Sequence, residues 1–146
     1  MNLSLGLKTI AKRFPGLPAI EWEGGTLTYS EFESQVSELA YSLQHYHGLP
    51  KGAKIAMAME NSAEFLVILF AIWRADMTAI PLNSKLHPKE LLWIFKNSSV
   101  DLVFATKNIA ERTVFDGPII SVGSKEFKKH FSGKYLSSVD MNSFIP

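Results

Sequence analysis

Apolar side chains near the start of the chain recur first at helical spacing and then at strand spacing. From residue 3 to residue 14 they return every three or four positions, which predicts a helix, and Pro15 and Gly16 end it. Residues 19–29 then alternate between apolar and polar side chains on either side of a Gly-Gly pair, which predicts a β-hairpin. We therefore expect the chain to open with a helix at 3–14 and a hairpin at 19–29.

A second helical stripe of apolar residues spans 32–43 and ends at a glycine-containing turn. The first residue of this helix is open, because two pairs of residues have the spacing of a capping box. One pair is Thr28 with Glu31, and the other is Ser30 with Glu33. Either pair predicts that the helix follows the hairpin directly.

The middle of the chain repeats a strand-and-helix rhythm. Short apolar strands are predicted at 54–59, 77–82 and 101–105. The first gap holds a helix preceded by a capping pair, Asn61 with Glu64, and the second holds a helix with Pro88 at its first position. A β-α-β-α-β order over residues 54–105 implies parallel strands joined by right-handed crossovers. The strands are continuously apolar, which indicates a sheet that is covered on both faces.

The remaining segments complete an expected α/β domain. A fourth strand is predicted at 118–122 and a short helix at 125–130. We expect an N-terminal α/β unit at 1–122 and a basic, partly irregular segment at 123–146. The helix at 62–74 is apolar nearly all round, so its burial suggests a partner surface outside these residues.

Composition narrows the class of protein without identifying it. The chain has 146 residues, of which 47% are hydrophobic and 20% charged, a formal net charge of +1 and no cysteine. This length suits one domain with a core of its own. The lack of cysteine excludes disulfides, cysteine-based zinc sites and a thiol nucleophile, and the near-neutral charge argues against nucleic-acid binding.

Membrane and targeting signals are not expected in this sequence. Residues 1–12 hold no long apolar run, so no secretory signal is predicted. No apolar run approaches the roughly 17–25 residues that cross a bilayer. We therefore expect a cytoplasmic protein without a transmembrane segment, and peripheral association with a membrane stays open.

The ends of the predicted strands carry no motif for catalysis or phosphate binding. Ligands of parallel sheets bind where the strands end, yet no G-x-G-x-x-G, G-x-x-x-x-G-K-[ST] or G-x-S-x-G sequence occurs there. Helix capping by Asn61 explains the polar residues after the first strand, and the basic run after residue 125 fits a solvated helix face. We therefore name no catalytic, cofactor-binding or metal-ligating residue.

Histidine and tryptophan positions favour structural roles over a metal or stacking site. His45 and His47 are two residues apart and share no helix face, so they are expected to be exposed or capping. His87 precedes Pro88 and should serve the start of that helix. The three tryptophans lie in apolar segments and are expected in the core: Trp22, Trp73 and Trp93.

Six segments carry motifs in a fixed order: LTYSEF at 27–32, GLPKGAKIA at 48–56, ENSAEF at 60–65, AIWRADMTAIPLN at 71–83, HPKEL at 87–91 and DLVF at 101–104. In order and spacing they resemble the opening motifs of adenylate-forming enzymes, the superfamily of acyl-CoA synthetases, luciferases and peptide-synthetase adenylation domains. Those motifs read L-T-Y-x-E-L, G-V-x-x-G-D-x-V-A, x-N-S-x-E-F, A-x-x-x-A-G-A-x-x-V-P-L-N and T-x-x-E-L, and the next strand follows them. The resemblance covers residues 19–105.

Three positions depart from the family pattern. Ala53 replaces an Asp, Asp76 stands where Gly is usual, and His87 stands where Thr often caps a helix. A side chain at position 76 requires a turn that tolerates it. The departures bear on the subfamily more than on the fold.

The resemblance implies a two-step ligase that uses ATP, magnesium and CoA. ATP and a carboxylic acid give an acyl-adenylate and pyrophosphate, and a thiol then captures the acyl group. The family's phosphate loop, magnesium-holding acid and catalytic lysine all lie downstream of the region resembled. The nearest approach to that loop is SGK at 132–134, which lacks its threonines and proline.

These considerations predict the N-terminal portion of an acyl-CoA synthetase-like ligase, acting as a scaffold and binding no cofactor by itself. Its partner would be the remainder of the ligase, and a homo-oligomer through exposed apolar surface is a further expectation. Two alternatives stay open. One is a stand-alone non-catalytic subunit of a split enzyme, and the other is a small α/β domain that binds a flavin, a nucleotide or a similar ligand.

Overall fold

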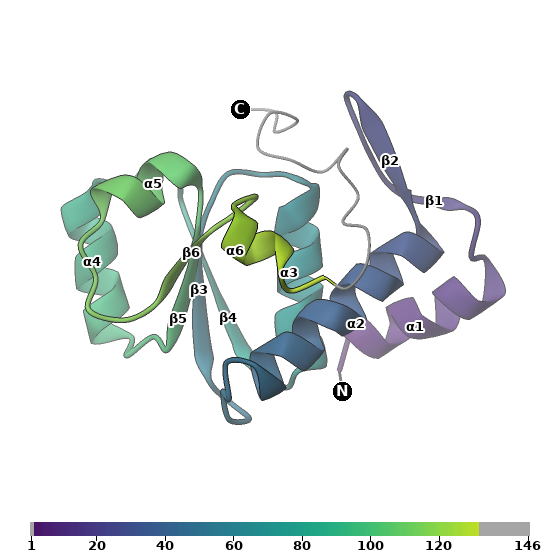
Figure 1. Cartoon of the computed structure of the whole chain (residues 1–146), viewed down its shortest axis with the longest axis horizontal. Coiled ribbons are helices and arrows are strands. Elements are labelled where there is room, and N and C mark those ends of the chain that lie inside the picture. Colours follow the sequence, from purple (N-terminus) through teal and green to yellow (C-terminus); the bar gives the residue numbers. More distant parts are fainter. Residues whose placement is uncertain (1, 132–146) are drawn as a thin grey trace.

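The computed structural model describes residues 2–131 and shows alternating helices and strands (Figure 1). The helices are α1 (Ser4–Arg13), α2 (Tyr29–His45), α3 (Ala63–Arg74), α4 (Pro88–Asn97), α5 (Lys107–Arg112) and α6 (Lys125–Lys128). The strands are β1 (Pro18–Trp22), β2 (Gly25–Thr28), β3 (Lys54–Ala58), β4 (Thr78–Leu82), β5 (Leu102–Ala105) and β6 (Ile119–Ser121).

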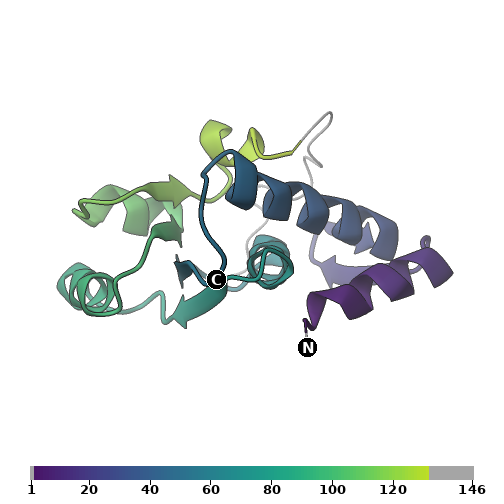
Figure 2. The same cartoon turned by 90° about the horizontal axis from the view of Figure 1, so that it is seen from below.

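The central sheet confirms the predicted α/β class. Its four strands are parallel and lie in the order β4-β3-β5-β6. Side chains alternate between the two faces. On one face Ile55, Met57 and Phe104 pack with α2, α3 and α6, and on the other Ala56 and Val103 pack with α4 and α5 (Figures 1 and 2). Both faces are covered, which is why the strands are continuously apolar.

Helix α3 is enclosed by other parts of the same chain. It packs against α1, α2, β1 and β4, and its residues Val67, Ile68 and Ala71 are almost fully buried. Of its large side chains, Leu66 is the one that is exposed, at 36%. We expected this helix to need a partner surface outside the chain, and for most of its circumference that expectation is wrong. The sequence pattern does not show that α1, α2 and the hairpin cover the helix.

A partly buried arginine joins helices α1, α2 and α3. The Arg74 guanidinium at the end of α3 makes a bidentate ion pair with Glu33 of α2, at 2.6 and 2.9 Å. The same group donates to the backbone oxygen and to Oγ of Ser4 in α1, at 2.7 and 3.0 Å. Asn2 adds a bond from Nδ2 to the carbonyl of Trp73, at 2.6 Å. These contacts hold α1 against the body of the molecule.

The structure decides which residues cap the helices. Thr28 and Glu31 form the capping box of α2, whereas the other candidate pair, Ser30 with Glu33, lies inside the helix. The predicted cap of α3 is wrong, because Ser62 and not Asn61 accepts the backbone N–H of Phe65, at 3.2 Å. A serine hydroxyl at that position reaches the third helical residue, as an N-cap side chain does.

The end of α3 explains how Asp76 replaces the usual glycine. Asp76 has a φ of +59°, in the left-handed region, and its N–H donates to the Trp73 carbonyl at 3.0 Å. The next residue, Met77, donates to Ile72 at 3.0 Å. This pair of bonds is a Schellman motif, in which aspartate is tolerated at a cost.

Several local expectations are corrected or extended. Helix α5 was not predicted, because its short sequence has only one buried residue, Ile109. Trp93 is 65% exposed and does not belong to the core. The short helix predicted at 125–130 is present as α6, and Phe127 and Phe131 beside it pack into the core. Residues 132–146, including the SGK segment, lie outside the described residues, and the division at 122 stays a prediction.

The outer edge of the sheet at β4 carries a proline. Thr78 donates its N–H toward β3, to the Ala53 carbonyl at 2.8 Å. Backbone groups of successive residues point to opposite sides of a strand, so Pro81 turns its nitrogen to the free edge. Because Pro81 lacks an N–H only on the free side, it removes no hydrogen bond between β4 and β3.

Candidate functional site

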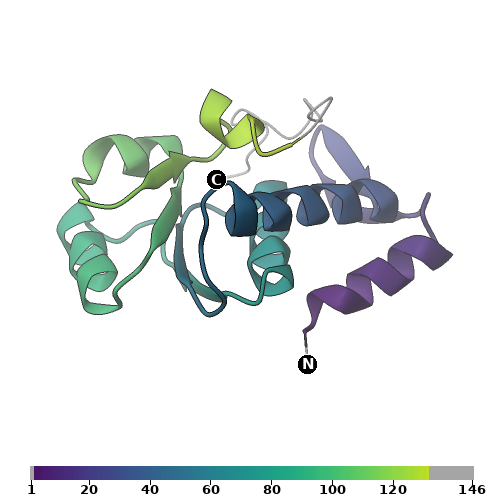
Figure 3. The same ribbon diagram turned by 60° about the horizontal axis from the view of Figure 1, so that its bottom comes forward.

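The topology defines one crevice at which a parallel sheet of this order binds ligands. Strands β3 and β5 are neighbours, but the chain leaves β3 through α3 on one face and leaves β5 through α5 on the other. Such a switch point opens a crevice at the carboxyl ends of the two strands. Figure 3 shows α5 and α3 on opposite sides of the sheet.

In this crevice the polar groups bond to one another. The N–H of Glu60, after β3, donates to Oγ1 of Thr106, after β5, at 3.0 Å. Thr106 is 7% exposed, and its own N–H donates to the Ala58 carbonyl at 3.1 Å. Thr106 was missed in the sequence, where the only signal was a threonine between an apolar strand and a short helical run. The hydroxyl bridges the ends of the two strands.

A hollow of about 680 Å³ lies beside this crevice, at the end of β6. Its wall includes Lys107 and Glu111 of α5, Ser124 and the backbone around Gly123. The Ser124 hydroxyl caps α6 by accepting from the Phe127 N–H at 3.2 Å. One lysine, one glutamate and a serine already engaged in a cap do not form a phosphate cradle.

The described residues do not fit the ATP, magnesium or CoA of the resembled family. Ser62 and Thr106, the hydroxyls nearest the switch point, are engaged in capping and in bridging the strands. Within residues 2–131 no group of three or more His, Asp or Glu side chains is placed to hold a metal ion. No reaction step is therefore derived through these groups, and the expectation that the chain alone binds none of them stays a prediction.

A pair of histidines forms a second constellation. His47, after α2, and His130, after α6, bring their Nε2 atoms within 2.8 Å, and the rings stack with centroids 5.1 Å apart. His130 Nδ1 lies 2.7 Å from the Phe127 carbonyl, an acceptor, so Nδ1 carries a proton. Of the two Nε2 atoms, one donates and the other accepts.

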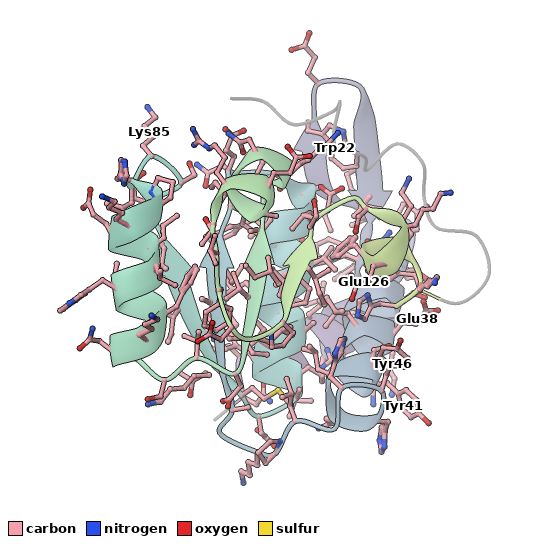
Figure 4. All side chains as sticks on the ribbon, turned by 60° about the vertical axis from the view of Figure 1, so that its left-hand side comes forward. Trp22, Glu38, Tyr41, Tyr46, Lys85 and Glu126 are labelled. Atoms are coloured by element: carbon pink, nitrogen blue, oxygen red, sulfur yellow. The ribbon has the colours of Figure 1, made fainter. Side chains whose placement is uncertain are left out.

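This pair borders a cavity of about 390 Å³ that Ser42, Tyr46, Glu126, Lys129 and His130 line. Figure 4 shows Tyr46 and Glu126 on this side of the molecule, far from Lys85. Burial and the neighbouring imidazole of His130 lower the pKa of His47, although the Glu126 carboxylate acts in the opposite direction. The hydrogen bond between the two rings joins α2 to the segment after α6.

The other histidines behave as expected. His45 is exposed and packs its ring on Tyr41, with centroids 4.2 Å apart. His87 caps α4 by accepting from the Lys89 N–H through Nδ1, at 3.1 Å. The expectation of an exposed or capping role is wrong for His47, because its partner is 83 residues away and no local spacing reveals it.

A parallel sheet with a switch point, preceded by a helix and a hairpin, defines the class of layered α/β domains that bind ligands at the carboxyl edge. The model of the family described as "AMP-binding enzyme" matches residues 7–138. The chain therefore belongs to the AMP-binding enzyme family, as its motifs predict.

Relatives of this chain include acid–CoA ligases. It is 32% identical over 94 residues to the 2-succinylbenzoate–CoA ligase of Bacillus cereus, covering 64% of this chain and 19% of the relative. It is 31% identical over 100 residues to the long-chain-fatty-acid–CoA ligase of Salmonella typhimurium, covering 68% of this chain and 18% of the relative. The chain thus spans about a fifth of the length of these two ligases.

Solved structures of the same fold agree with the arrangement of helices and strands. The fatty acyl CoA synthetase of Mycobacterium tuberculosis superposes with a TM-score of 0.77 at 20% identity, over 88% of this chain and 28% of that one. The N-terminal subdomain of Klebsiella oxytoca NpsA, in complex with anthranilyl-AMSN, gives 0.75 at 21%, over 92% and 34%. Among the helices described, none has the length and apolarity needed to cross a membrane.

Proposed function

We propose that this chain is the N-terminal α/β scaffold of an AMP-forming ligase that joins a carboxylic acid to a thiol. The observation that carries the proposal is the family match over residues 7–138 in a chain that spans about a fifth of two related ligases. The described part of the chain supplies a buried sheet and capped helices rather than reactive groups. Because the residues at the carboxyl ends of the strands are engaged in structural hydrogen bonds, they support a scaffold role.

In the intact enzyme, ATP and the acid would give an acyl-adenylate and pyrophosphate, and CoA would then take the acyl group. The residues of this chain would contribute by holding the carboxyl ends of β3 and β5 in fixed positions. The bond from Glu60 to Thr106 ties the ends of these two strands together, and Ser62 fixes the start of α3. A rigid edge gives later sequence a fixed base on which to build the nucleotide site.

The acid substrate is not assigned. The related ligases are named for 2-succinylbenzoate and for long-chain fatty acids, and a further relative in Arabidopsis thaliana is named for oxalate. These acids differ in size and polarity, while the identities to this chain differ by only a few per cent. A cytoplasmic location and a homo-oligomer likewise stay predictions.

Pyrophosphate release tests the scaffold role directly. The purified 146-residue chain, incubated with ATP, magnesium, CoA and a panel of fatty and aryl acids, should release none above a no-protein control. A second arm replaces the matching region of the Salmonella typhimurium ligase with residues 7–138 of this chain. The chimera should keep measurable turnover of long-chain acids. Turnover by the chain alone, or a folded chimera without activity, would contradict the proposal.

The alternative of a separate non-catalytic subunit makes the same scaffold prediction but differs in the coding sequence. An in-frame continuation that encodes the phosphate loop supports one longer enzyme, and a separate downstream frame supports a split enzyme. The small-ligand alternative predicts calorimetric binding of a flavin or nucleotide to the chain. The engaged hydroxyls of Ser62 and Thr106 weigh against that alternative.

A further inference from the structure

The hydrogen bond between His47 and His130 connects two parts of the chain that are distant in sequence. The two Nε2 atoms are 2.8 Å apart, although the residues are 83 positions apart. The Ser42 hydroxyl of α2 adds a longer bond to the His130 carbonyl, at 3.4 Å. Contacts at this histidine pair therefore help to hold residues 124–131 against the end of α2.

The bond between the two rings depends on how many protons the pair carries. Nδ1 of His130 already carries a proton, because it faces the Phe127 carbonyl at 2.7 Å. With one proton between the two Nε2 atoms, one ring donates and the other accepts, and a neutral pair and a singly charged pair can both be arranged in this way. A second positive charge places a proton on each Nε2, which leaves no acceptor between the rings and brings two cations together. The pair therefore keeps its bond through one protonation and loses it at the second.

Uncharged aromatic rings lie beside the buried member of the pair. His130 is 6% exposed, and the rings of Phe104 in β5 and Phe127 in α6 lie 6.5 and 6.1 Å from its imidazole, between centroids. Such surroundings stabilise an imidazolium much less than water does. A second charge on the pair is therefore unfavourable while the pair stays in place.

Titratable side chains of α2 and α6 also face the pair. The ring of Tyr46, at the end of α2, lies 5.1 Å from the ring of His47, and Glu126 and Lys129 line the same cavity as His130 (Figure 4). The Glu126 carboxylate favours a charged His47, but burial and the neighbouring imidazole outweigh it and lower the pKa of His47. The Lys129 ammonium is a further positive charge at this cavity. These charges do not compensate for a doubly protonated pair.

We propose that the histidine pair is a pH-sensitive switch that releases residues 124–131 from α2 in mildly acidic solution. Entry of the second proton breaks the bond between the rings, and the two like charges of His47 and His130 then repel each other. Phe127 and Phe131 lie beside the pair and are 0% and 7% exposed, so release loosens the packing of this segment in the core. Strands β3 and β5 contain neither histidine and stay folded. This inference is independent of ligase chemistry and extends beyond the proposed function.

The size of the effect follows from the protons that the released segment can bind. Once the rings are apart, each imidazole ionises with the ordinary histidine pKa of about 6.5, whereas the joined pair binds one proton fewer. Each pH unit below 6.5 therefore favours release about tenfold. At pH 5.0 the ratio of released to docked segment should be roughly 30-fold higher than at pH 7.5. Carboxylates with ordinary pKa values of about 4 stay largely ionised at that pH, so the change reports on histidine.

Hydrogen exchange of backbone amides tests the proposal in the 146-residue chain. Exchange is measured by peptide at pH 7.5 and pH 5.0, and each rate is compared with that of an unstructured peptide at the same pH, which gives a protection factor. The protection factor of residues 124–131 should fall roughly 30-fold, while those of β3 and β5 should change less than about threefold. An unchanged protection factor at 124–131, or an equal fall in the two strands, would overturn the proposal.

Two histidine variants separate the pair from the other effects of acid. His47→Gln removes a titratable ring and keeps an amide that can donate to His130 or accept from it, so the fall in protection at pH 5.0 should shrink to less than about threefold. His45→Gln is the matched control, because His45 is exposed at the end of the same helix and packs on Tyr41 instead of the pair. It should keep the roughly 30-fold response.

The variants can also contradict the proposal. A response that persists in folded His47→Gln, or that disappears in His45→Gln, would overturn the assignment to the pair. Circular dichroism at pH 7.5 verifies the fold of both variants. If His47→Gln does not fold, the exchange of the unmodified chain still decides, because release must be confined to residues 124–131.

Discussion

The partly buried contact of Arg74 with Glu33 and Ser4 should be a main source of stability for the N-terminal helices. The substitution Arg74→Met keeps a long apolar stem and removes the guanidinium. It deletes both bonds to Glu33 and both bonds to Ser4. It leaves the Glu33 carboxylate and the Ser4 carbonyl without their charged donor.

The magnitude follows from burial. The side chains of Arg74 and Glu33 are 13% and 16% exposed, so the pair lies between a surface ion pair and a fully buried one. Exposed pairs contribute about 0.2–1 kcal/mol, and removing one partner of a buried pair costs about 3–5 kcal/mol. We therefore expect Arg74→Met to lower the free energy of unfolding by about 2–3 kcal/mol.

Urea unfolding at pH 7, followed by tryptophan fluorescence, measures this loss. A double-mutant cycle with Glu33→Gln should give a coupling free energy of about 1–2 kcal/mol, because the two residues share their bonds. Arg112→Met removes an exposed arginine of α5 and serves as the control, with a change below about 0.5 kcal/mol. A loss for Arg74→Met no larger than that of the control would refute the reasoning.

The same pair should be sensitive to acid. Burial opposes ionisation of Glu33, but hydrogen bonds from Arg74 and Ser37 and the positive charge of Arg74 outweigh it and lower the pKa of Glu33 below its ordinary 4.5. A lowered carboxylate pKa contributes stability above pH 4.5 that is lost as the pH falls through the value in the folded protein. The stability advantage over Glu33→Gln should therefore shrink below about pH 4.5. A constant difference from pH 7 to pH 3 would contradict this.

Three further predictions concern single positions. Because the pKa of His47 is lowered, its NMR titration should have a midpoint below 6.5, and stability should decline as the pH falls below 6.5. A midpoint above 6.5 would contradict the effect of burial and of the neighbouring imidazole. Asp76→Gly should raise the free energy of unfolding by about 0.5–1 kcal/mol in urea, because Asp76 has a positive φ; a loss would point to a native role for its carboxylate. Thr28→Ala should lower the free energy of unfolding by about 1 kcal/mol, because it breaks the capping box. Ser30→Ala in the same turn should lower it by less than half of that. Equal losses in the two variants would contradict the assignment of the cap.

Most of the fold could be predicted because its strands and helices have strong local patterns. The apolar strands around Ile55 and Val103 and the spacing between them imply a parallel sheet before any contact is known. The capping box at Thr28 and the first-turn proline at 88 mark helix starts through local chemistry. Such signals depend on neighbours in sequence: Pro88 begins α4 as predicted, Thr28 is one of the two caps left open for α2, and the cap predicted for α3 is one residue off.

Long-range contacts could not be predicted. The bond between His47 and His130 joins positions 83 residues apart, and the ion pair of Glu33 with Arg74 joins positions 41 apart. Neither pair has a periodic or spacing signal. The exposure of Trp93 was missed for a related reason, since an apolar helix segment does not reveal how wide its covered face is.

In the candidate site, too, local features could be predicted from the sequence and long-range contacts could not. The sequence shows that the strand ends lack a glycine-rich phosphate motif, and the expectation that these residues bind no phosphate stays a prediction. The role of Thr106 depends on β3 and β5 being neighbours, which follows from the order of strands rather than from residues near position 106. Strand order is a property of the whole chain.

Proline at position 81 makes the two edges of the sheet unequal as places where a further strand can pair. An incoming strand at the β4 edge would find no N–H at Pro81 to pair with, so that side resists both misassembly with another chain and extension of the sheet. At the other margin β6 pairs only with β5, and the backbone groups on its far side are not used by a strand of the described region. Any strand that is added to this sheet, such as one from an engineered peptide, should therefore join it beside β6.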